Sequence, residues 1–184
     1  MNLLFHACMG VSLAHALGAG APGTMDVVLM GTASVSPDLD ALSALGGRER
    51  YRRWHRSLGH SLPAVAALPS AVALGLGARA GALWALAMGA HVAVDLLSAP
   101  GVALAFPASA RRWQLPLLSW GDCYLSGGYL AAAWLGVLYP EAAQPLGATA
   151  ILALPLYLLY RRRHPLEGDP LRGWWFGLVW GGRR

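Results

Sequence analysis

The sequence contains no lysine, only two cysteines and few charged residues of any kind. Charged residues make up 12% of the 184 residues, about half of the roughly 25% that is usual in soluble domains. Hydrophobic residues make up 56%, which excludes a disordered chain and disfavours an ordinary soluble enzyme. Two cysteines, Cys8 and Cys123, are too few for a disulfide framework, and they suit a reducing compartment or a membrane interior.

The chain has instead a series of long apolar runs. A helix that spans a bilayer needs about 20 mostly apolar residues. Four of the runs reach or nearly reach that length with their flanking residues, whereas the second is short and suits a tilted or partial span. We therefore expect an all-α, polytopic membrane helix bundle with about five to six hydrophobic helices. The runs cover Leu3–Leu17, Thr24–Val35, Leu62–Gly77, Gly81–Leu97, Tyr124–Tyr139 and Leu146–Tyr160.

The positions of the arginines predict the orientation of these helices. With the N-terminus in the cytoplasm, 13 of the 14 arginines fall in cytoplasmic loops or in the C-terminal tail, and only Arg79 lies outside. This agrees with the preference of basic residues for the cytoplasmic side, and it explains the net charge of +5 without nucleic acid binding, which we do not expect. We expect a multi-pass protein of the inner (plasma) membrane with both termini in the cytoplasm. Residues 1–163 would form one integral membrane domain and residues 164–184 a short Arg/Trp-rich cytoplasmic tail.

Ionisable residues within or beside apolar runs are costly, so each of them needs a partner or a function. In the topology above, eight of them fall near the cytoplasmic face, although the arginines alone defined that topology. The eight are His6, Asp38, Asp40, His55, His60, His91, Asp95 and Asp122. Two independent patterns therefore predict a His/Asp site on the cytoplasmic side of the membrane.

The residue types and their spacing indicate a metal site. Histidine and aspartate together suit zinc, manganese or iron better than a thiolate site would. His91 and Asp95 are four residues apart and would share one face of a helix. Asp38 and Asp40 flank Leu39 in an irregular segment after Pro37, where an extended backbone would place them on the same side. We expect a divalent metal, with zinc as the first choice and manganese or iron as alternatives, bound as one ion or as two ions roughly 3.5–4 Å apart.

Several of these residues also have simpler interpretations. Asp122 fits a helix N-cap as well as it fits a supporting role in the site. His91 and Asp95 could form a structural hydrogen bond, and Asp38 and Asp40 could belong to a loop turn. Three other residues are assigned outside the site: His15 to an interhelical hydrogen bond, Asp26 to a helix N-terminus and His164 to a solvated tail.

The arginine-rich segment from Arg48 to Arg56 has two interpretations. The favoured one is a loop that faces anionic lipids, which attract basic residues by about 1 kcal/mol each. The alternative is a phosphate-binding site formed by Arg52, Arg53 or Arg56, because the guanidinium group matches phosphate geometry. Both interpretations can hold together.

Three motifs occur in a fixed order and resemble a known family. They are Ser36-Pro37-Asp38-Leu39-Asp40, His55-Arg56-Ser57-Leu58-Gly59-His60-Ser61-Leu62 and His91-Val92-Ala93-Val94-Asp95-Leu96-Leu97-Ser98, followed by Gly101, Phe106-Pro107 and Asp122. With an N-terminal helix histidine, His6 or His15, residues 3–125 resemble the YdjM-like family, described as LexA-binding, inner-membrane-associated metal-dependent hydrolases. The resemblance implies a metal-dependent membrane hydrolase, and it is the only basis for expecting a regulator as a partner. Pro100 departs from the family pattern, which usually has an aromatic residue before this glycine.

The residues and the resemblance together suggest a hydrolase at the cytoplasmic membrane face. Its metal ligands would come from His6, Asp38, Asp40, His55, His60, His91 and Asp95. Asp38 or Asp40, when not a ligand, would act as the general base. Neighbouring arginines and membrane lipids favour a phosphoester or a lipid-linked substrate. Two alternatives remain open: a non-enzymatic membrane protein with a metal-stabilised core or a regulator-binding surface, and a transporter of metal ions or protons.

Overall fold

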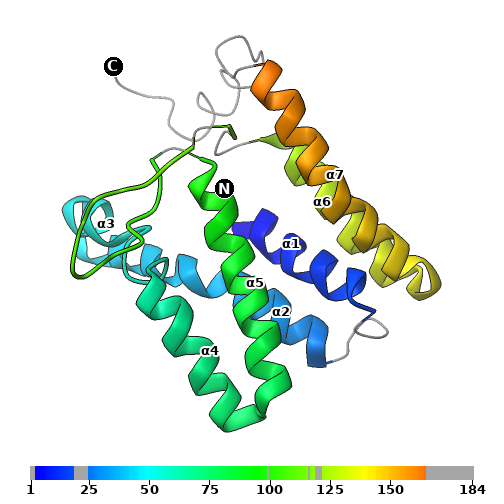
Figure 1. The fold of residues 1–184 in the computed structure, drawn as a ribbon, viewed down its shortest axis with the longest axis horizontal. Coiled ribbons are helices and arrows are strands. Elements are labelled where there is room, and N and C mark those ends of the chain that lie inside the picture. Colours follow the sequence, from blue (N-terminus) through cyan, green and yellow to red (C-terminus); the bar gives the residue numbers. More distant parts are fainter. Residues whose placement is uncertain (1–2, 19–24, 99, 116, 119–121, 165–184) are drawn as a thin grey trace.

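The computed structural model describes residues 3–18, 25–98, 100–115, 117–118 and 122–164 (Figure 1). All regular elements in these residues are helices, apart from two isolated bridges that join Ser98 to Leu118 and Val102 to Trp113. The all-helical prediction is therefore confirmed. The elements are α1 (Leu3–Ala16), α2 (Met25–Val35), η1 (Ser36–Gly46), α3 (Arg48–Trp54), α4 (Leu62–Leu76), α5 (Ala78–Leu96), α6 (Cys123–Leu138), η2 (Pro140–Ala142) and α7 (Ala143–Arg163).

Helix α1 lies at the centre of the bundle and packs against α2, α6 and α7 (Figure 1). Helix α2 also packs against α5, and the antiparallel pairs α4/α5 and α6/α7 complete the bundle. Two apolar clusters form its core, one around Phe5, Met9 and Tyr129 and one around Met30 and Ala87. The N-terminal end of α1 and the C-terminal half of α5 are thereby held together.

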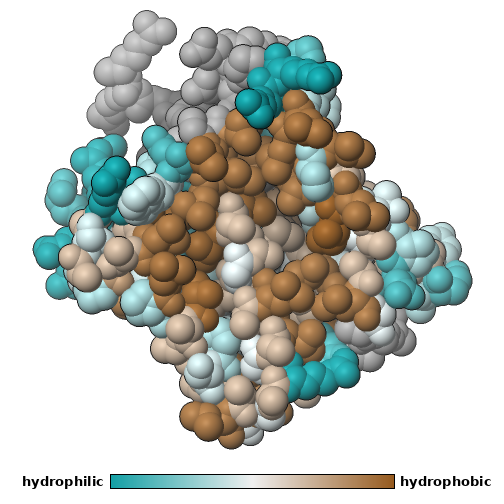
Figure 2. Space-filling model, viewed as in Figure 1, coloured by the Kyte–Doolittle hydropathy of each residue, from teal (hydrophilic) through white to brown (hydrophobic). Residues whose placement is uncertain are grey.

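One helical stretch of the described residues, Pro140–Arg163, is long and apolar enough to cross a membrane. Only 11% of its apolar window is buried inside the protein, unlike the core helix of a soluble domain. Helices α1, α4 and α6 are apolar but shorter. The 14 residues of α1 extend about 21 Å, less than the roughly 30 Å of a hydrocarbon core. The prediction of five to six complete spans is therefore not confirmed, although hydrophobic side chains cover much of the face in Figure 2.

The segment around Pro37, which was predicted to be irregular, forms the 11-residue 3₁₀ helix η1. Such a helix has three residues per turn, so residues two apart point in different directions. Asp38 and Asp40 therefore lie on adjoining faces of η1, and the prediction that they share one side is wrong. The helix ends at Gly46, where Gly47 adopts a φ of 96° that favours glycine.

Glycine allows two close approaches between segments that carry the site motifs. A Cβ atom at Gly59 would overlap the carbonyl oxygen of Pro37, so the loop before α4 lies directly on the start of η1. A Cβ atom at Gly10 would overlap the carbonyl oxygen of Met30, so α1 and α2 are in backbone contact. These contacts bring residues that are far apart in the sequence to one end of α5.

Candidate metal centre

Four ligand atoms converge where η1, the loop before α4 and helix α5 meet. Asp38 comes from η1, His60 from the loop, and His91 and Asp95 from α5. One ligand atom from each residue lies within 4.8 Å of the other three. His60, His91 and Asp95 are completely buried, whereas the side chain of Asp38 is 10% exposed. The group can therefore hold a metal ion that reaches the surface only beside Asp38.

The distances within this group are of the size expected around a small divalent ion such as zinc. Four atoms about 2.0–2.1 Å from zinc in tetrahedral geometry lie about 3.3 Å from one another. The His60 Nε2 atom is 3.0 Å from His91 Nε2, 3.4 Å from Asp95 Oδ2 and 3.6 Å from Asp38 Oδ1. The His91 Nε2 atom is 3.7 Å from Asp95 Oδ2 and 3.8 Å from Asp38 Oδ1. Five of the six distances among the four atoms are thus close to tetrahedral dimensions, and the sixth is at most 4.8 Å.

Hydrogen bonds on the far side of both imidazole rings fix Nδ1 as a donor. The His91 Nδ1 atom is 2.6 Å from the carbonyl oxygen of Ser34, and the His60 Nδ1 atom is 3.0 Å from Asp40 Oδ2. Carbonyl and carboxylate oxygens only accept hydrogen bonds, so Nδ1 of each ring donates, and a bound ion would take the place of any proton on Nε2. Ser34 was not predicted, because it contributes a backbone carbonyl that carries no signal in the sequence.

Asp40 supports the site by a hydrogen bond to His60, one of the four residues of the group. Its carboxylate accepts hydrogen bonds from His60, from His55 Nδ1 at 2.9 Å and from the Ser57 backbone N–H at 3.3 Å. Burial raises the pKa of the Asp40 carboxyl, but the hydrogen bonds from His55 and His60 outweigh burial and hold that pKa below its usual value. The structure therefore places Asp40 and His55 next to the four-atom group and not within it.

The site carries an excess of negative charge. Burial lowers the pKa of His60, but the surrounding carboxylates of Asp38, Asp40 and Asp95 outweigh burial and raise it to about 10. Burial likewise raises the pKa of Asp38, and the neighbouring His60 and His91 bring it below its usual value. Three carboxylates that stay ionised around buried imidazoles form an environment that favours a cation.

His6 flanks the group on the side of Asp95. Its ring stacks on the His91 ring with 3.6 Å between centroids, and its Nε2 atom lies 3.3 Å from Asp95 Oδ1. His6 is completely buried, and neither ring nitrogen has a hydrogen-bond partner among the residues that the structure describes. His6 therefore faces Oδ1 of Asp95, whereas Oδ2 of Asp95 belongs to the four-atom group.

Arg56 lies inside the site, whereas the two neighbouring candidate arginines do not. Its guanidinium group contacts both Asp95 oxygens, at 3.1 and 3.2 Å, and donates to Ser98 Oγ at 3.1 Å. Arg52 is exposed and pairs with Glu49 at 3.8 Å, and Arg53 lines an open cavity beside α3. Arg56 therefore holds Asp95 in place, and the three arginines do not form one phosphate site.

Asp122 belongs to a second buried cluster. Its carboxylate caps α6 by accepting from the Leu125 N–H at 3.1 Å. It also accepts from the Tyr157 hydroxyl at 2.7 Å and from Arg161 at 2.9 Å. Of the two interpretations, the geometry favours the N-cap. Neither Tyr157 nor Arg161 was predicted to be its partner, because α7 has no motif that marks them.

The remaining ionisable residues lie away from the four-atom group. His15 is buried, but its ring nitrogens make no hydrogen bond within the described part of the chain, so the predicted interhelical hydrogen bond is not found. Asp26 lies in the first turn of α2, as predicted, and pairs with Arg79. His164 is the exposed residue that follows α7.

Replacing Asp40 by asparagine tests its supporting role. We expect Asp40→Asn to weaken metal binding about 10- to 100-fold, the usual cost of losing the hydrogen-bond partner of a ligand. Asparagine keeps the shape but cannot accept from both histidines as a carboxylate does. Metal titration of the purified protein measures the effect, with Asp26→Asn as the matched control. Equal affinities of the two variants would contradict the assignment.

Comparison with known proteins gives one family. The family described as YdjM inner membrane protein matches residues 1–181, nearly the whole chain. Searches among curated proteins and among solved structures gave no match. The family match covers all three motifs that meet at the four-atom group. The chain therefore belongs to the YdjM inner membrane protein family.

Proposed function

We propose that the protein is a membrane-bound, metal-dependent hydrolase that acts on a phosphoester or lipid-linked substrate at the cytoplasmic membrane face. Asp38, His60, His91 and Asp95 hold one divalent ion, with zinc as the first choice. The observation that supports this most strongly is the tetrahedral spacing of the four ligand atoms, together with the hydrogen bonds that orient both imidazoles.

One ion fits this arrangement better than two. A second ion would use the outer oxygen of Asp95 together with His6. That oxygen already contacts the buried guanidinium group of Arg56, 3.2 Å away. Arg56 also lies 3.1 Å from the ligand oxygen Oδ2 of Asp95, so its charge does not by itself distinguish one ion from two. The proposal of one ion rests on the single group of four ligand atoms found among the described residues.

The residues divide the catalytic tasks according to their contacts. When bound, the ion would polarise the scissile bond and lower the pKa of a water molecule from 15.7 towards about 7. Asp38 has the most exposed side chain of the site carboxylates, so during turnover it would leave the ion and take a proton from water at the entrance. Asp40 is less suited, because His55, His60 and Ser57 already occupy its oxygens. Arg56 orients Asp95.

A metal-stabilised structural core is the second candidate function. Four protein ligands around a tetrahedral zinc ion are typical of structural sites, whereas catalytic sites keep one position open. The complete burial of His60, His91 and Asp95 favours this alternative. In the hydrolase, Asp38 would leave the ion or share it with substrate, because it is the one ligand at the surface.

Metal analysis paired with activity measurements separates the two candidates. We expect detergent-purified protein to carry one divalent ion per chain and to hydrolyse a member of a panel of phosphatase and lipase substrates. A chelator should abolish turnover, and added zinc should restore it. Asp38→Asn should abolish turnover, whereas Asp26→Asn should not. Bound metal without turnover on the whole panel would favour the structural core, and absence of metal would overturn both.

We further propose that both termini and the site lie in the cytoplasm. Two contacts between distant segments support the arginine-based topology. Asp26 pairs with Arg79, and both belong to the outer side in that topology. Arg112 donates to the carbonyl oxygens of Arg52 and His55, and all three belong to the cytoplasmic side.

Cysteine labelling of intact cells tests this orientation, in a background where Cys8 and Cys123 are replaced. We expect Ala44→Cys and Gly182→Cys to resist a membrane-impermeant reagent until the cells are opened. Ala78→Cys, beside Arg79, should react from outside and serves as the positive control. Labelling of Ala44→Cys from outside would reverse the orientation.

A further inference from the structure

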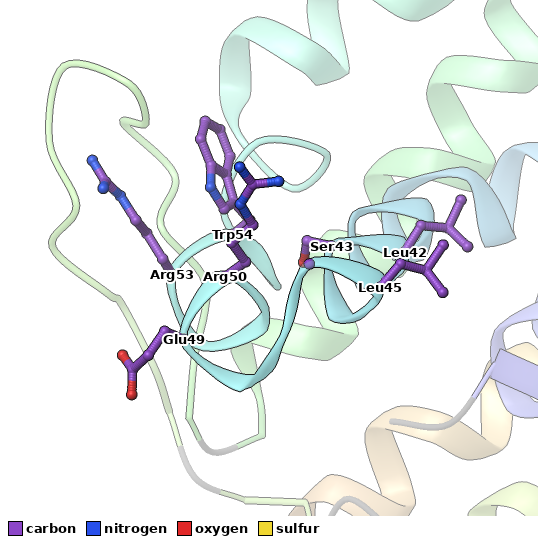
Figure 3. Close-up of a pocket in the computed structure, with 8 residues that line it drawn as sticks. Leu42, Ser43, Leu45, Glu49, Arg50, Arg53 and Trp54 are labelled. Carbon is purple, nitrogen blue, oxygen red and sulfur yellow. The ribbon is translucent and has the colours of Figure 1, made fainter.

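An open cavity of about 840 Å³ lies between η1 and α3, and none of the four ligand residues lines it (Figure 3). Its lining combines apolar, polar and charged side chains: Leu42, Leu45, Ser43, Arg50, Arg53 and Trp54, together with the acidic Glu49. The Ser43 Oγ atom is buried and has no hydrogen-bond partner among the described residues. The cavity therefore offers an unused hydroxyl and two guanidinium groups beside exposed leucines.

The leucines form a continuous stripe because of the unusual helix on which they lie. Residues three apart are aligned in a 3₁₀ helix, and η1 has leucine at positions 39, 42 and 45. Their exposed fractions are 59%, 61% and 89%. In Figure 3, Leu42 and Leu45 extend together from one side of η1. An α-helix would spread these side chains over a wider arc, so the 3₁₀ geometry concentrates them.

Helix α3, which follows η1, is rich in basic side chains instead of leucines. Arg48–Trp54 contains four arginines and one glutamate, and the glutamate makes an exposed pair with Arg52. Because Gly46 has no side chain, Arg50 can lie over the end of η1. A Cβ atom at position 46 would overlap the Arg50 side chain. Guanidinium groups match phosphate oxygens, and tryptophan is enriched at headgroup depth. The leucine stripe, the arginines and Trp54 thus occur together within 16 residues, from Leu39 to Trp54.

We propose that η1 and α3 form a docking surface for the anionic phospholipids of the membrane in which the protein resides. The leucine stripe enters the boundary between headgroups and acyl chains, and Arg50, Arg53 and Ser43 bind the lipid phosphate. Charge complementarity and the adjacent apolar stripe together select this occupant, since a free phosphate ion would leave the leucines exposed. The surface goes beyond the proposed hydrolase, because it requires neither metal nor turnover.

Docking at this surface has a consequence for the depth of the candidate site. Leu39 lies between Asp38 and Asp40 in η1, so a bilayer that covers the leucine stripe comes within one residue of the site carboxylates. The Asp38 side of the site would then open at the level of the lipid phosphates. The same short helix would serve both as membrane contact and as one wall of the site.

The environment of single labels in nanodiscs tests the proposal, in the background without Cys8 and Cys123. An environment-sensitive fluorophore on Leu42→Cys reports the stripe, and one on Ala44→Cys reports another exposed face of η1. We expect the Leu42 label to shift to shorter wavelength as phosphatidylglycerol replaces phosphatidylcholine and to be quenched by lipid-borne nitroxide. The Ala44 label should do neither.

Charge variants locate the phosphate contacts. The double variant Arg50→Gln/Arg53→Gln should raise the phosphatidylglycerol fraction that gives half of the shift by roughly threefold or more. The control Arg162→Gln/Arg163→Gln removes equal charge from the exposed end of α7 and should leave the shift unchanged. A folded arginine variant with an unchanged lipid dependence would overturn the phosphate contacts.

Two results would overturn the leucine contact. One is a Leu42 label that stays in an aqueous environment at every lipid composition. The other is a label that is buried equally in detergent and in both lipids, which would show that the chain itself or a second copy covers the stripe. Metal content measured on the same samples keeps this result separate from the hydrolase proposal, since either can fail while the other holds.

Discussion

Replacing His91 or Asp95 by alanine is expected to remove bound metal from the purified protein. Each variant loses one of the four atoms that converge on the site, and three protein ligands bind a divalent ion less tightly than four. The loss of affinity should exceed the 10- to 100-fold expected for the supporting residue Asp40. Metal analysis after dialysis measures the effect, and any hydrolytic activity should disappear with the metal.

A matched histidine separates loss of a ligand from general damage. His15→Ala also removes a buried imidazole, but His15 lies outside the four-atom group and should leave the metal content unchanged. Thermal unfolding in detergent must accompany each measurement, because the His91 variant also frees the Ser34 carbonyl, and the Asp95 variant leaves Arg56 without its carboxylate. Folded His91 and Asp95 variants that retain full metal content would reduce the cluster to a hydrogen-bonded core.

Replacing Asp122 by alanine is expected to destabilise the protein strongly while leaving metal binding intact. The change removes the N-cap of α6 and leaves the buried Arg161 without this carboxylate. Breaking a buried ion pair from one side costs about 3–5 kcal/mol, and loss of a cap adds about 1 kcal/mol. Unfolding in detergent with increasing denaturant should show the loss, and metal titration at low denaturant should show an unchanged affinity.

Two further variants divide this effect into its parts. Asp122→Asn keeps an acceptor for the Leu125 N–H but removes the charge, so it should recover only the contribution of the cap. Asp26→Ala breaks an exposed pair with Arg79 and should cost at most about 1 kcal/mol. If Asp122→Ala instead lost its metal while keeping its stability, Asp122 would belong to the metal site after all.

The sequence was informative wherever local spacing determines geometry. Six apolar runs predicted α1, α2, α4, α5, α6 and α7 to within a few residues, because apolar length alone identifies such helices. His91 and Asp95 were predicted to share a helix face, and the pitch of α5 places their ligand atoms 3.7 Å apart. The composition and the arginine pattern likewise indicated a membrane protein, in agreement with the family match.

Only the tertiary structure decided which of the candidate residues meet. Asp38 and Asp40 are two positions apart in one motif, yet the 3₁₀ winding of η1 sends Asp38 to the four-atom group and Asp40 to the outer side of His60. Arg56 follows His55 directly, yet Arg56 contacts Asp95 and His55 contacts Asp40. Such distances depend on how whole elements pack, here on a glycine at position 59 that lets one loop touch the start of η1. The sequence by itself determined the helices and the chemistry of the candidate site, and the packing between helices selected its members, because contacts between distant segments follow no fixed spacing along the chain.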